Sequence, residues 1–103
     1  MARVRICSGV CGFCTAVETA ATDMMRVEVR IESDCPHCTT LAAELQAVNP
    51  FQELKPDQPG GILDVAKKHL PHAACPVPPG IVKAVEVAAG LALPRDATIT
   101  FED

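Results

Sequence analysis

The stretch from Met25 to Ser33 alternates apolar or small residues with charged ones. The first set holds Met25, Val27, Val29, Ile31 and Ser33, and the second holds Arg26, Glu28, Arg30 and Glu32. Because successive side chains of a strand point to opposite faces, this alternation predicts a strand in a sheet that is covered on one side only. A chain of 103 residues has room for one such sheet and a few helices, so we predict a single domain, 1–103.

Weaker patterns surround this strand. Val4 and Ile6 alternate with arginines as in a short strand, and a second strand is predicted over Thr15–Ala21. After Cys35 the apolar residues follow a helical period: Leu41, Ala42, Leu45 and Val48 share one helix face, which Asn49-Pro50 ends. Further helices are predicted over Leu63–Leu70, with Leu63, Ala66 and Leu70 inward, and Ile81–Ala89, and a last strand over Ala97–Phe101. The predicted class is α+β, with a small antiparallel meander sheet packed on about three helices.

Charge and composition argue against several function classes. The net charge is −4, aromatic residues make up 3%, and the chain has no Trp or Tyr, so we expect no nucleic-acid partner. No apolar run approaches the roughly 20 residues that span a bilayer, so we expect no membrane partner. The first residues lack the apolar core of a signal peptide, and we therefore expect a cytoplasmic protein.

Six cysteines are the unusual part of the composition: Cys7, Cys11, Cys14, Cys35, Cys38 and Cys75. As a disulfide framework they would allow 15 connectivities, but such a framework needs an oxidising compartment. In the cytoplasm, a cluster of this kind indicates metal, iron–sulphur or redox chemistry.

Three of the cysteines occupy comparable places. Cys11 lies in a glycine-flanked turn between strands, Cys35 lies where a strand enters a helix, and Cys75 stands just ahead of another helix. A helix N-terminus favours the thiolate, which is the form that binds metal. We therefore predict Cys11, Cys35 and Cys75 as ligands of an iron–sulphur cluster or a zinc ion, both of which suit thiolates. The fourth ligand would come from Cys14, Cys38 or His72.

Packing is the alternative role for every cysteine, because free cysteine is often simply buried. It is our interpretation for Cys7, which stands in a predicted strand. If it holds for all six, the chain is an interaction module with no metal.

A different chemistry follows from Cys35-Pro36-His37-Cys38. A strand that runs into C-x-x-C at a helix N-terminus resembles the thioredoxin-like oxidoreductases, and the Cys-Pro-His-Cys sequence looks like the pair of the DsbA type. This resemblance implies a thiol–disulfide oxidoreductase in which Cys35 attacks and Cys38 resolves. The fit is local, because three predicted strands precede the motif and a helix follows where that fold needs a strand.

The order of elements also resembles the iron–sulphur cluster scaffold proteins of the IscU/NifU type. The resemblance implies an IscU-like fold with Cys11 (in Val10-Cys11-Gly12), Cys35 and Cys75 as the three ligands, and a protein that donates or accepts the cluster as partner. The role it implies is binding, and catalysis belongs to the oxidoreductase alternative. One departure is Phe13, which stands where the scaffold family has an Asp that aids cluster release.

A closer resemblance in sequence covers 74–94 and Ser33-Asp-Cys-Pro36. There the chain is similar to a family of small uncharacterised proteins from anaerobic microbes. That resemblance implies no activity, but it fits a setting in which thiolates and clusters survive.

Overall fold

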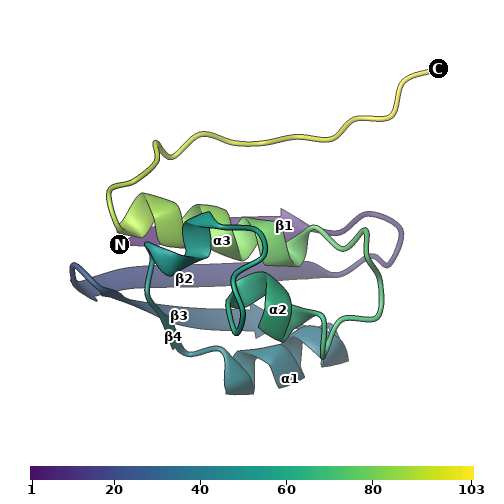
Figure 1. The fold of residues 1–103 in the computed structure, drawn as a ribbon. Helices are drawn as coiled ribbons and strands as arrows, with labels where there is room; N and C mark the ends of the chain where they lie inside the picture. The colour runs from purple at the N-terminus through teal and green to yellow at the C-terminus, as the bar shows by residue number, and fades with distance from the viewer.

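The first half of the chain forms an antiparallel meander. In the computed structural model, which describes residues 1–103, the sheet order is β1-β2-β3-β4 (Figure 1). The strands are β1 (Ala2–Cys7), β2 (Cys14–Asp23), β3 (Arg26–Ser33) and the short β4 (Ala47–Val48). With three helices beside it, this sheet confirms the predicted α+β class.

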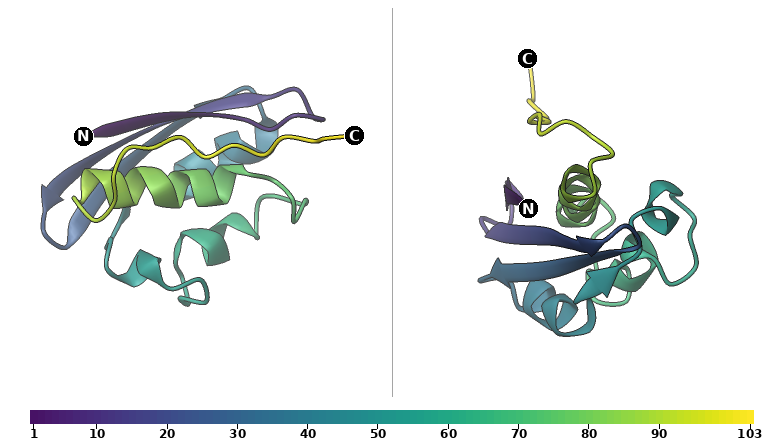
Figure 2. Two further views of the ribbon diagram at one scale, coloured as in Figure 1. Left: turned by 90° about the horizontal axis from the view of Figure 1, so that it is seen from above. Right: turned by 90° about the vertical axis from the view of Figure 1, so that its left-hand side faces the viewer.

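Period-two patterning decides which face of the sheet is buried. Val17, Val27, Val29 and Ile31 are buried, whereas the charged residues between them are exposed, as the alternation predicts. Register places Val17 opposite Ile31 on one face and Glu18 opposite Arg30 on the other. Helices α1 (Pro36–Glu44) and α3 (Val77–Ala88) pack on the first face, here called the covered face, and α2 (Ile62–Ala66) packs against α3 (Figure 2). The second face is called the open face. Met25, predicted on the apolar face, instead lies exposed in the turn before β3.

The first helix ends earlier than predicted. Helix α1 spans Pro36–Glu44, and Val48, which we placed on its apolar face, belongs to β4 and pairs with Val27. The backbone N–H of Leu45 still bonds to Leu41, but Leu45 itself has left the helical region. The pairing of β4 with the free edge of β3 is therefore more favourable in free energy than one more turn of α1.

The other two helices are also shifted from their predicted bounds. A 3₁₀ turn (Gln52–Leu54) leads to α2, which spans only Ile62–Ala66; Leu63, predicted inward, is exposed, while Ala66 and Leu70 are buried. Helix α3 spans Val77–Ala88 and starts before the predicted Ile81. Its early start is possible because prolines are tolerated in the first turn, where no intrahelical N–H bond is needed.

The core lies between the covered face and the helices. It is one cluster of 15 buried apolar residues from β2, β3, all three helices and the segments that follow α1 and α2. Helix α3 crosses β1 and β2 so closely that a Cβ atom on Gly80 would overlap the side chain of Ile6. The predicted last strand, 97–101, is wrong for this structure, because the segment after α3 is extended, unpaired and exposed.

Candidate functional site

Topology brings all six cysteines to one end of the sheet. Cys7 ends β1, Cys14 begins β2 opposite it, and Cys11 lies in the loop between them. Because β3 runs antiparallel to β2, its end at Ser33 lies beside Thr15, and α1 with its cysteines starts there. We call this the cysteine end; it lies at the right of Figure 1.

The same end also holds the start of α3. Gly80, in the first turn of this helix, lies against Ile6, the residue before Cys7. Cys75 precedes the helix by two residues, so the third predicted ligand comes to the same end. Three segments that are far apart in sequence therefore meet there: 8–13, 33–38 and 72–77.

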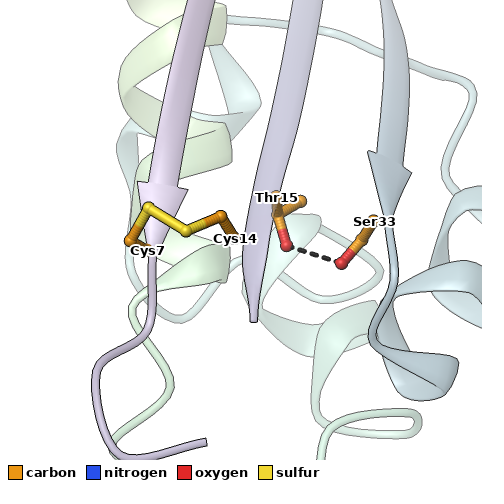
Figure 3. The surroundings of a disulfide bond; sticks show 4 residues. All are labelled: Cys7, Cys14, Thr15 and Ser33. Carbon is orange, nitrogen blue, oxygen red and sulfur yellow. Dashed lines mark hydrogen bonds between the residues drawn. A yellow bond between two sulfur atoms is a disulfide. The ribbon is translucent and has the colours of Figure 1, made fainter. Parts of the chain in front are cut away.

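One pair of cysteines is joined. Cys7 and Cys14 form a disulfide across β1 and β2 on the open face, where both residues are exposed (Figure 3). The interpretation of Cys7 as a packed residue is therefore wrong. In this oxidised state, Cys14 has no thiolate to offer a metal.

Cys11 lies in the loop that the disulfide closes. It is exposed, and glycines with left-handed backbone angles stand two residues before it and directly after it, at Gly9 and Gly12. Two backbone hydrogen bonds hold the loop, from Ser8 N–H to the Phe13 carbonyl (3.0 Å) and from Gly12 N–H to the Gly9 carbonyl (2.9 Å). The thiol of Cys11 is therefore free and exposed to solvent in this arrangement.

Cys35 is the N-cap residue of α1, directly before Pro36. Its backbone N–H donates to Ser33 Oγ (3.1 Å), and its carbonyl accepts from the backbone N–H of Thr39 (3.0 Å). Ser33 Oγ in turn is 2.8 Å from Thr15 Oγ1, a bond that joins β2 to β3 (Figure 3). The half-buried Cys35 is thus held rigidly at the sheet end.

Cys38 lies one turn further along α1 and is buried. Burial raises the pKa of its thiol; the hydrogen bond from Thr15 Oγ1 (3.9 Å) opposes that rise, and the neighbouring Cys35 adds to it. Cys38 is therefore a neutral thiol inside the core, close enough to Cys35 for their side chains to interact. The helical spacing of apolar residues predicted a helix after Cys35. It did not indicate that Thr15 and Ser33 would form hydrogen bonds with Cys38 and Cys35.

Cys75 is half-buried at the approach to α3, where it packs against the core. Its backbone N–H donates to the carbonyl of His72 (3.3 Å), so the two residues share a tight turn. His72 itself is exposed.

The donors do not stand around a common point in this structure. No group of three or more His, Cys, Asp or Glu side chains lies close enough together to hold one metal ion. The structure brings Cys11, Cys35 and Cys75 to the same end and pairs Cys35 with Cys38, but it leaves Cys11 apart. No helix has the length and apolar character that crossing a bilayer requires.

The fold and these thiols define a small α+β domain with a cysteine-bearing end. Residues 2–101 match the model of DUF6951, a family of unknown function, and the chain belongs to that family. Neither the comparison with curated proteins nor that with solved structures gives a match. The resemblance to IscU/NifU scaffolds therefore stays a prediction.

Proposed function

We propose that the cysteine end binds an iron–sulphur cluster or a zinc ion in the cytoplasm, through Cys11, Cys35 and Cys75. The observation that carries this proposal is the meeting of three segments, each with one of these thiols, at one end of the sheet. Thiolates are soft ligands that suit both groups. A protein that donates or accepts the cluster is the partner that this proposal implies.

Two of the three ligands are fixed by helix starts, and the third is carried by a loop. Binding therefore requires the segment 8–13 to close over Cys35 and Cys75. Ordering six residues costs at most roughly 6–12 kcal/mol. Zinc binding to a thiolate site contributes about 10–16 kcal/mol at neutral pH, so a site that assembles on binding is energetically accessible.

The fourth ligand depends on the redox state. A reducing cytoplasm opens exposed disulfides, which would release Cys14 as a thiol next to the loop. Cys38 is a weaker candidate, because burial holds it in the neutral form and removes it from solvent. His72 is exposed and lies three residues before Cys75, which leaves it free to turn toward the site.

The test is anaerobic purification under reducing conditions, followed by metal and sulphide analysis and a visible absorption spectrum. Sulphur-to-iron charge-transfer bands identify a cluster, and one zinc per chain in colourless protein identifies a zinc site. Loss of a group that only supports a ligand costs roughly 10- to 100-fold in affinity, so we expect loss of a ligand itself, in Cys11→Ser, Cys35→Ser or Cys75→Ser, to cost more than that. Cys7→Ser is the matched control and keeps the metal. Metal-free protein from such preparations, or a control as damaging as the three variants, contradicts the proposal.

The Cys35-Pro36-His37-Cys38 sequence at the start of α1 favours a second candidate function, thiol–disulfide exchange. The Cys35 thiolate would attack a substrate disulfide, form a mixed disulfide and release one substrate thiolate. Cys38, once deprotonated, would then attack Cys35 Sγ, which forms the Cys35–Cys38 disulfide and releases the second substrate thiolate. The raised pKa of Cys38 lowers its thiolate fraction and so slows this second step.

A disulfide reductase assay separates the two functions. Exchange chemistry requires that Cys35→Ser abolish the activity while Cys11→Ser and Cys75→Ser retain it. If the protein instead only binds a metal or cluster, binding depends on all three thiols and the wild type shows no reductase activity. Loss of activity in all three variants, or an inactive wild type, speaks against the exchange mechanism.

A further inference from the structure

One edge of the sheet and one segment of the chain both lack a partner. The sheet order makes β1 an edge strand: it pairs with β2 alone, so the backbone N–H and carbonyl groups on its outer side have no strand beside them. An unpaired edge of this kind readily accepts another strand. Its covered-face residues Ala2, Val4 and Ile6 are only half-buried, because nothing flanks them beyond the edge.

The segment from Gly90 to Asp103 follows α3 and is exposed throughout. Ile99 is 86% exposed and Phe101 is 97% exposed, values that leave two large apolar side chains in water. These residues and Ala97 alternate with Thr98, Thr100 and Glu102. The segment 97–102 thus has the period of a strand but no hydrogen bond to one.

The segment starts near the free edge. Figure 1 and the left view of Figure 2 both show that it leaves the end of α3 near the N-terminus of β1 and then runs in the same direction as β1, while the right view of Figure 2 shows that its end stands clear of the sheet. Ala97 lies seven positions after Gly90, which gives a reach of roughly 23 Å when extended. Pro94 lies in this linker, so no proline interrupts the strand-like stretch.

We propose that residues 97–102 dock on β1 of the same chain as a fifth, parallel strand. Side chains at equivalent positions of neighbouring strands share a face, so alignment of Ala97 with Ala2 puts Ile99 beside Val4. The same alignment puts Phe101 beside Ile6. All the exposed apolar side chains of the stretch then lie on the covered face, next to half-buried ones.

The open face gains matching charges in this arrangement. Thr98, Thr100 and Glu102 come to lie on the side of Arg3 and Arg5, so the acid of the segment stands near the bases of β1. Shifting the segment by two residues along β1 keeps its apolar side chains on the covered face and its acid near the arginines. A shift of one residue would put Ile99 and Phe101 on the open face. The tether favours the same chain as acceptor over a second copy, because it raises the local concentration of the segment.

Docking would carry the end of the segment to the cysteine end. A parallel strand that starts beside Ala2 finishes beside Cys7, with Glu102 and Asp103 next to the exposed disulfide and the loop of Cys11. This arrangement is independent of the metal and the exchange proposals, since neither uses the edge of β1.

Hydrogen exchange of the full chain tests the docking. We expect the outward amides of β1 and the amides of 97–102 to exchange at least roughly tenfold slower than those of an unstructured segment. Nuclear Overhauser contacts are expected between the Phe101 ring or the Ile99 methyls and the methyls of Val4 and Ile6. The double variant Ile99→Ser/Phe101→Ser should lose both signals, while Leu93→Ser, an exposed apolar position in the linker, should keep them.

Three results would overturn the proposal. Unprotected amides over 97–102 in the wild type would show that the segment does not dock. Protection that appears only at high protein concentration, together with a dimer in sedimentation, would assign the segment to a second copy. Equal loss of protection in Leu93→Ser would show that general hydrophobicity, and not the alternating stretch, is responsible.

Discussion

Reduction of the Cys7–Cys14 disulfide should lower the stability of the protein by a predictable amount. The bond closes a ring across seven positions of sequence separation. Loop-closure entropy for so short a ring corresponds to about 2 kcal/mol of stability. For a domain of this length, that change lowers the midpoint of thermal unfolding by roughly 10 °C.

The assay is denaturant and thermal unfolding with and without reductant. The double variant Cys7→Ser/Cys14→Ser is the matched reference, because it cannot form the bond. Its stability should equal that of the reduced wild type, and reductant should not change it. The wild type should keep its sheet after reduction, since the strand pairing of β1 with β2 and the bond from Ser8 N–H to Phe13 remain.

The reasoning is refuted if oxidised and reduced wild type unfold at the same midpoint. The loop-closure entropy that the disulfide removes from the unfolded chain would then contribute nothing measurable to stability. A loss several times larger than the value above would also refute it, since the bond would then be holding the native fold and not restricting the unfolded one.

Three further perturbations follow from single contacts. A methyl group on Gly80 would lie 2.7 Å from Ile6 Cγ1, so Gly80→Ala should cost about 1–3 kcal/mol in chemical denaturation, and Ile6→Ala should relieve part of that cost in a double-mutant cycle. Glu53 Oε1 accepts the first N–H of α2 at 2.7 Å; Glu53→Ala should cost about 1–2 kcal/mol, whereas Glu53→Gln, which keeps the acceptor, should cost little. Burial raises the pKa of Glu53, so its contribution is present below the unfolded-state pKa and is lost as pH rises through the higher folded-state value. Stability relative to Glu53→Gln should therefore fall as pH rises above about 4, and a flat difference would contradict this. Alkylation of native, reduced protein should modify Cys11 first and Cys38 last, by roughly 100-fold or more in rate, because Cys38 is buried and its pKa is raised; equal rates in mass spectrometry would show that the core opens freely.

Local periodicity predicted the elements whose partners are near in sequence. The alternation over β3 is set by side chains two residues apart, and the structure confirms it from Arg26 onward. The early end of α1 could not be found in this way. Val48 fits a helix face by spacing, but it pairs with Val27, 21 residues earlier, and only the completed sheet makes that pairing available.

The candidate site shows the same limit. Spacing placed Cys11, Cys35 and Cys75 next to a turn and two helix starts, and the structure places those features at one end of the sheet. The disulfide was missed because it depends on register: Cys7 and Cys14 face each other only when β1 and β2 pair as they do. Their symmetric positions on either side of a glycine-containing loop were the one available signal.

The sheet divides the sulphur atoms into two sets. Cys7 and Cys14 face outward on the open side, while Cys38 lies behind β2 among the helices. A strand layer is impermeable to a reacting thiol, so no direct exchange can run through it. Any transfer of a disulfide from the outer pair to the inner one would have to pass around the rim of the sheet, where Cys11, Cys35 and Cys75 are the free cysteines that solvent reaches.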